Sequence, residues 1–145
     1  MRRRLVVMAA VIGLAVALSG CSSPDPVASD ATIQLTRDGG DMQIHDRMEL
    51  HPDGTWSYTN TAGAQFTGTL APGQTSAAYA LVTSPEFAKE MVRSTAGMDC
   101  SDAPNLRLTA GGRTSTYFGC FKEKWPKTAA LVDLLQREIA NPHER

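Results

Sequence analysis

The sequence predicts one α+β domain, an antiparallel sheet of about five to six short strands with two to three helices on one face. Short stretches of alternating apolar and polar residues, typical of half-buried strands, lie between 33 and 70 and again between 105 and 120. Turns rich in glycine and proline separate them. Apolar residues return at helical spacing near 85–92 and 126–140, which predicts helices that cover one side of the sheet.

The first part of the sheet is predicted as four consecutive strands. Gly39-Gly40 interrupts the alternation that starts at Ile33. Pro52-Asp53-Gly54 predicts a hairpin turn, because proline restricts φ and glycine accepts a positive φ. The four strands are predicted from Ile33 to the break at 37–41, over about 44–51, over 55–59 and over 65–70.

Two helices should follow this part of the sheet. Pro72-Gly73 ends the strands, and residues 75–82 predict a short helix. Ser84 precedes Pro85, a capping residue followed by proline at the first helical position. The second helix should therefore run to about Val92.

A second hairpin is predicted around Gly111-Gly112, with strands over 105–109 and 113–120. With a two-residue turn, Tyr117 faces the leucines of the first strand. With one bulge residue in the turn, Phe118 faces them instead. We expect the bulge, because it buries Phe118.

The last helix is predicted from Pro126 to about Ala140, and Asn141-Pro142 should end it. Its side chains form an apolar stripe at a spacing of three and four residues. The stripe consists of Leu131, Leu134, Leu135 and Ile139.

The first twenty residues have the order of an export signal. Arg2 to Arg4 supply the positive start, an uncharged apolar stretch covers 5–18, and small residues follow. A helix that crosses a bilayer needs about 20 apolar residues, so this stretch is too short for a permanent span. We therefore predict a signal peptide over residues 1–20.

Leu18-Ser19-Gly20-Cys21 resembles the lipobox of bacterial lipoproteins. The resemblance implies cleavage before Cys21, diacylglycerol on its sulfur and a further acyl chain such as palmitate on its new amino group, and at least two chains make anchoring stable. The implied location is the extracytoplasmic face of the cell membrane. Ser22 is not the aspartate that retains some lipoproteins at the inner membrane, so an outer-membrane location also fits. The alternative role for Cys21 is an ordinary disulfide.

Cleavage would leave a small, weakly acidic protein. The remaining 125 residues suit one domain, predicted over 33–145, after a lipidated cysteine and polar tether over 21–32. Ten flexible residues reach less than about 20 Å. Loss of three arginines leaves 11 basic and 15 acidic residues, a net charge of −4. This charge argues against a nucleic-acid partner.

The cysteines that remain beside the anchor form an even pair. Cys100 and Cys120 would reach an oxidising compartment, which favours a disulfide between them. Two free thiols or a metal site are the alternatives.

The sequence indicates no catalytic residue, no metal site and no cofactor. His45 and His51 would lie about 20 Å apart on one strand, too far to share a zinc ion. Ser101 beside Asp102, and Asp102 with Asp99, fit a solvated loop better than a reactive pair. We therefore expect a protein that is not an enzyme.

The most unusual predicted surface precedes the last helix. Cations at a helix N-terminus oppose its dipole, and a feature that costs stability can mark a binding site. Alternatively, the tryptophan packs on the helix and the lysines point to water. The residues of this lysine segment, a candidate partner surface, are Lys122, Lys124, Trp125 and Lys127.

Residues 33–139 resemble emfourin, a family of small bacterial inhibitors of thermolysin-like metalloproteases. The similarity lies in the Gly39-Gly40 break, the hairpin over 49–54, the Gly68-Thr69-Leu70 sequence before a helix, and the closing amphipathic helix. The resemblance implies a non-enzymatic binding module that inhibits secreted metalloproteases, with no inhibitory residue carried over. The alternative is an envelope structural or assembly factor that docks a membrane protein complex through the lysine segment.

Overall fold

The computed structural model describes residues 24–98 and 100–140. The signal peptide, the lipobox with Cys21, and Asp99 lie outside these residues, as does the predicted helix stop at 141–142.

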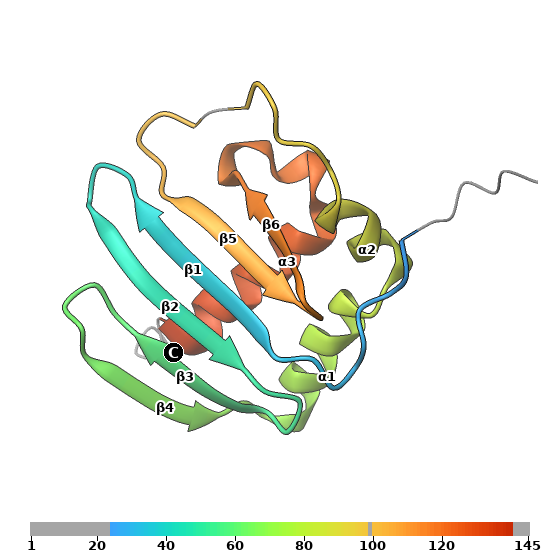
Figure 1. Ribbon diagram of the computed structural model, residues 1–145. Helices are drawn as coiled ribbons and strands as arrows, with labels where there is room; N and C mark the ends of the chain where they lie inside the picture. Colours follow the sequence, from blue (N-terminus) through green and yellow to red (C-terminus); the bar gives the residue numbers. More distant parts are fainter. Residues whose placement is uncertain (1–23, 99, 141–145) are drawn as a thin grey trace, which may run out of the picture.

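The described residues form one sheet of six strands, in the order β4-β3-β2-β1-β5-β6, with every neighbouring pair antiparallel (Figure 1). Strand β1 lies inside the sheet because the chain, after two helices, returns to place β5 against its other edge. The predicted α+β class is confirmed. The strands are β1 (Ile33–Gly39), β2 (Ile44–Leu50), β3 (Thr55–Thr59), β4 (Gln65–Thr69), β5 (Asn105–Ala110) and β6 (Arg113–Tyr117).

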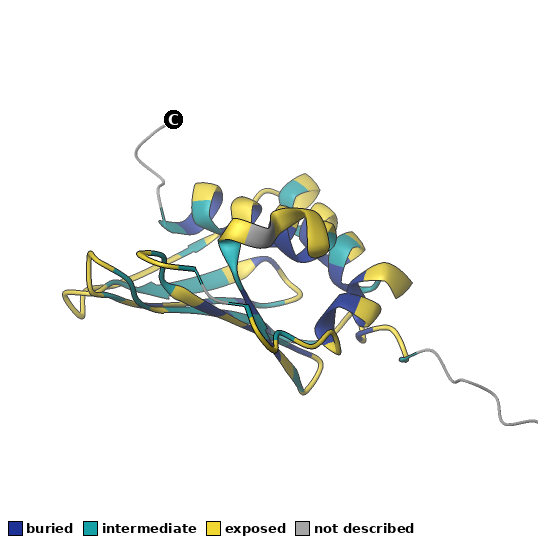
Figure 2. Ribbon diagram, turned by 90° about the horizontal axis from the view of Figure 1, so that it is seen from above, coloured by how far each residue is buried: buried dark blue, intermediate teal, exposed yellow. Residues whose placement is uncertain are grey.

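Helices form a second layer on one face of this sheet (Figure 2). Helix α1 begins three residues earlier than predicted, because Pro72 takes the first position and the Gln74 side chain accepts a hydrogen bond from the Ala71 amide at 3.0 Å. A 3₁₀ helix replaces the end of the strand predicted over 113–120. The helical elements are α1 (Pro72–Val82), α2 (Pro85–Met91), the 3₁₀ helix η1 (Gly119–Lys124), α3 (Pro126–Leu135) and the π-helical turn η2 (Gln136–Ala140).

The core lies between the sheet and the helices. Alternate residues of β1, β2 and β5 are buried, as the period of a strand requires. All four residues of the predicted stripe on the last helix are buried against them, which confirms its orientation. The central side chains of the sheet are Ile33, Leu35, Met48, Leu50, Leu106 and Leu108.

The bulge predicted in the second hairpin is wrong. Leu106 pairs with Tyr117, so Gly111 and Gly112 form a two-residue turn without an extra residue. Both glycines have positive φ, 56° and 72°, as a type I′ turn requires. Tyr117 is therefore buried, and Phe118 is only half-buried.

The N-terminal segment also differs from the tether expected over 21–32. Val27 is 5% exposed and belongs to the core. The Asp25 carbonyl accepts a hydrogen bond from the Arg113 guanidinium, and the Ala31 carbonyl accepts one from the Tyr79 hydroxyl at 2.9 Å. The described part of this segment, 24–32, is thus held on the domain.

Two buried tyrosines provide a matched test of hydrogen bonding in the core. The Tyr79 hydroxyl donates to the carbonyls of Ala31 and Leu50, whereas the buried Tyr117 hydroxyl has no hydrogen-bond partner among the described residues. Burial raises the pKa of each tyrosine to about 12.

Replacing Tyr79 with phenylalanine is expected to lower the free energy of unfolding by about 1 kcal/mol, because two buried carbonyls lose a donor. Tyr117→Phe should leave it unchanged or raise it, because the substitution removes an unpaired polar group. Urea denaturation measures both values. Equal losses of stability in the two variants would contradict the hydrogen bonding assigned to the two tyrosine hydroxyls.

Candidate functional site

The sheet face opposite the helices is open and entirely polar over the described residues. Side chains of β1 to β6 that point away from the core alternate with the buried ones, and none of them is buried. Threonine is the commonest residue among them, with arginine, glutamate, glutamine, aspartate, asparagine, serine and histidine. In Figure 2 the helices lie above the sheet and leave this face uncovered. We refer to it as the open face.

A shallow hollow of about 610 Å³ lies at one end of the open face. This is the end where β1 finishes and where β2 and β5 begin, since Asp38 pairs with both His45 and Asn105. The lining side chains that point to the open face are Thr36, Asp38, His45, Arg47, Thr59, Asn105, Arg107 and Thr116.

The charges in the hollow are only partly paired. The Asp38 carboxylate and the His45 ring are hydrogen-bonded, and Arg47 Nε donates to Glu49 Oε1 at 3.0 Å. Arg107 is exposed and has no ionic partner in the described part of the chain. A guanidinium among threonine hydroxyls can bind a carboxylate of a partner through two parallel hydrogen bonds.

A buried ion pair stiffens the sheet beneath the hollow. Arg37 Nε donates to Asp46 Oδ1 at 2.8 Å, and a second guanidinium nitrogen and the Tyr58 hydroxyl bind Oδ2. The Asp46 side chain is 2% exposed. The hydrogen bonds that Arg37 donates to Asp46 raise the pKa of Arg37. Burial, then the charge of Asp46, raises the pKa of Tyr58. Arg37 lies on β1, Asp46 on β2 and Tyr58 on β3, so these hydrogen bonds join the three strands.

The structure removes Trp125 from the predicted partner surface. The tryptophan is 0% exposed, its Nε1 donates to the Glu90 carbonyl at 3.3 Å, and its ring meets Tyr117 edge-on. Arg93 covers the ring at 5.8 Å from its centroid. This large aromatic side chain is therefore part of the core.

The lysines of the segment do reach the surface. Lys122 forms an ion pair with Asp133 at 3.5 Å, in which both side chains are more than half exposed. Lys124 is exposed, and Lys127 is half-buried.

Glu90 has a structural role in this region that the local sequence does not predict. Its buried carboxylate lies at the N-terminus of α3 and accepts hydrogen bonds from the backbone amides of Lys127 and Thr128. A carboxylate there compensates the lysines that oppose the helix dipole. No local pattern indicates this cap, because Glu90 lies on α2.

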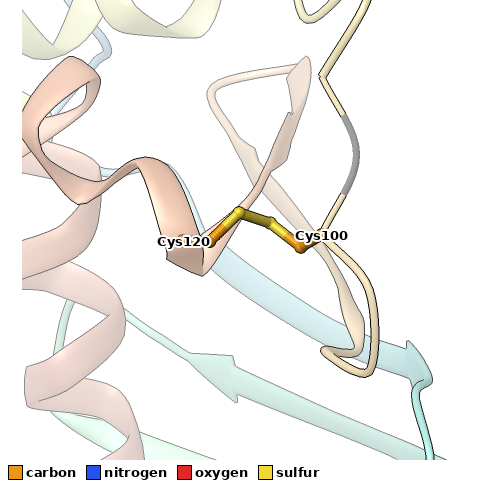
Figure 3. Close-up of a disulfide and its surroundings, with 2 residues drawn as sticks. All are labelled: Cys100 and Cys120. Carbon is orange, nitrogen blue, oxygen red and sulfur yellow. A yellow bond between two sulfur atoms is a disulfide. The ribbon is translucent and has the colours of Figure 1, made fainter.

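Cys100 and Cys120 form the predicted disulfide (Figure 3). Their Cα atoms are 6.2 Å apart, and the bond joins the loop after α2 to the start of η1. Ser101 and Asp102, in the same loop, are both exposed. The loop is thus tied to the segment that leads into α3.

The two described histidines lie apart. His45 belongs to the hollow, and His51 lies near Thr32, with 3.3 Å between its Nδ1 and the threonine hydroxyl. Across 24–98 and 100–140, no three histidine, cysteine or carboxylate side chains are grouped to hold a metal ion.

Within the same residues, none of the helices has the length and hydropathy needed to cross a membrane. No family model matches the chain, and no curated protein matches it significantly.

Proposed function

We propose that this chain is a lipid-anchored protein of the bacterial cell envelope that acts by binding a protein partner rather than by catalysis. The observation that carries the proposal is the open face, which is wholly polar and is hollowed at one end around Arg107, a side chain without an ionic partner among the described residues. Helices cover the other face, so the open face is the broad surface that a partner can reach. The lipobox at 18–21 supports the location.

The specific form of the proposal is an inhibitor of secreted thermolysin-like metalloproteases, which follows from the emfourin resemblance. Such an inhibitor must resist cleavage itself, and the paired strands and the disulfide across the loop after α2 restrain the chain that a protease could attack. A lipid anchor would keep it at the surface it protects.

The second candidate function is an assembly factor that docks a membrane protein complex. Its supporting observation is the group of Lys122, Lys124 and Lys127, which suits an acidic partner. The two candidates use different surfaces, so substitutions can separate them.

The test measures inhibition of a thermolysin-like protease by the chain from Ser22 onward. We expect inhibition in the micromolar range or below, and a loss of affinity of about tenfold for Arg107→Glu, because the charge in the hollow is reversed. Lys89→Glu, the same change on the exposed side of α2, should bind normally.

The absence of inhibition would remove the inhibitor form of the proposal. Co-purification of a partner with the envelope protein then separates the two surfaces. Loss of the partner with Arg107→Glu supports the hollow, and loss only with Lys122→Glu and Lys124→Glu supports the assembly factor.

A further inference from the structure

The described N-terminal segment is fixed to one end of the domain, where β5 turns into β6 (Figure 1). Val27 lies directly over Gly111, where a Cβ atom would come within 2.9 Å of its Cγ1. The Arg113 guanidinium holds the Asp25 carbonyl, and Tyr79 holds that of Ala31. The near end, as we term the Gly111-Gly112 turn with residues 25–31, is therefore one packed unit.

Very little chain separates the near end from the predicted lipid. Only Ser22, Ser23 and Pro24 lie between Cys21 and Asp25. Four extended residue steps span at most about 14 Å. A tether that ran free to residue 32 could extend more than twice as far and would leave the domain without a preferred orientation. The packed segment removes that freedom.

The hollow lies at the opposite end of the sheet. Ile33 pairs with Ala110 at the near end, and Asp38 pairs with Asn105 at the hollow. The six residue steps of β1 from Ile33 to Gly39 cover about 20 Å.

Outside the near end, the described residues offer the bilayer no apolar patch. The large apolar side chains that are exposed lie on three separate elements, Met42 at 83%, Phe66 at 46% and Val92 at 62%, so they form no continuous apolar patch. The charged residues within the near end are Asp25 and Asp30, and Arg113 directly follows it, so the near end presents no cationic patch to anionic lipids. The covalent anchor therefore decides which end meets the membrane.

We propose that the near end rests on the lipid headgroups and that the hollow is held away from the membrane, toward its partner. This inference rests on the proposed lipidation of Cys21 and adds the surface of the domain that faces the bilayer. Residues 25–31 fix the orientation of the domain relative to the membrane and do not act as a flexible tether.

The test uses the full lipidated chain in vesicles of phosphatidylethanolamine and phosphatidylglycerol that contain lipids with a nitroxide on the headgroup. A fluorophore is attached through Thr114→Cys near the Gly111-Gly112 turn, or through Met42→Cys in the turn between β1 and β2 at the far end. With Cys21 acylated and the other two cysteines paired, the introduced thiol is the reactive one. We expect the label at 114 to be quenched several-fold more strongly than the label at 42.

A variant that loosens the packed segment tests whether residues 25–31 set the orientation. Val27→Ser should detach the segment and reduce the difference between the two labels, whereas Val92→Ser, at an exposed valine, should leave it unchanged. The comparison of the two labels in the otherwise unaltered chain does not depend on the Val27 variant.

The outcomes separate the two proposals. Equal quenching at 114 and 42 on vesicle-bound, acylated protein overturns the orientation and leaves the lipid anchor intact. Quenching that changes with the fraction of phosphatidylglycerol also overturns it, because the orientation would then depend on charge. An intact mass without acyl groups on Cys21 overturns the proposed anchor itself.

Discussion

Replacing Glu90 with alanine is expected to lower the free energy of unfolding by about 3 kcal/mol. Glu90 is 3% exposed, and its carboxylate accepts three hydrogen bonds at the N-terminus of α3. The donors are the Lys127 amide at 3.0 Å, the Thr128 amide at 2.7 Å and the Thr128 hydroxyl at 2.8 Å. Without the carboxylate, these buried donors and the positive end of the helix dipole lose their partner.

Two further variants separate the contributions of Glu90. Glu90→Gln preserves the volume but turns an amide nitrogen toward a donor, so we expect a loss of about 2 kcal/mol. Glu123→Ala removes an exposed carboxylate from the neighbouring 3₁₀ helix and should change stability by less than about 0.5 kcal/mol. Urea denaturation gives all three values. If Glu123→Ala cost as much as Glu90→Ala, general electrostatics rather than a cap would explain the loss.

This cap also shows where prediction from sequence ends. The start of α2 is predictable because its signal is local: the Ser84 hydroxyl accepts from the Phe87 amide at 3.2 Å, with proline at the first helical position. The start of α3 has no such residue. Its cap comes from another helix, so the local sequence shows only the lysines that oppose the dipole.

The bulge predicted in the second hairpin does not form, because turn geometry outweighs the burial of Phe118. A bulge would have buried Phe118, but two adjacent glycines favour a two-residue turn with positive φ at both positions. That turn places Tyr117 in the core, where its hydroxyl lacks a hydrogen-bond partner among the residues that the structure describes. The backbone preference thus outweighed the gain from the more apolar residue.

Local sequence patterns predict neither the near end nor the hollow. Residues 22–31 are polar and contain two prolines, which is typical of a tether. The contact of Val27 with Gly111 joins residues that are 84 positions apart in the sequence, and it needs a residue without a Cβ atom at position 111. Likewise, Arg107 meets Thr36 and His45 in one hollow only because β5 returns to pair with β1.

The disulfide should contribute as much stability as Glu90, but by restricting the unfolded chain. Replacing Cys100 and Cys120 together with serine is expected to lower the free energy of unfolding by about 3 kcal/mol, because the bond closes a loop with a sequence separation of 20. Reduction of the disulfide in the unaltered protein should lower the free energy of unfolding by the same amount. A reductant can reach the bond because Cys100 is half-buried and Cys120 is exposed.

The denaturant dependence distinguishes this mechanism from that of the helix cap. An unfolded chain without the cross-link exposes more surface, so the slope of unfolding free energy against urea should increase in the double serine variant. Glu90→Ala acts on the folded state and should leave the slope unchanged. An unchanged slope in both variants, or unchanged stability on reduction, would mean that the bond does not act by restricting the unfolded chain. The start of α3 would then be held by Trp125 and Glu90, without a contribution from the disulfide between η1 and the loop after α2.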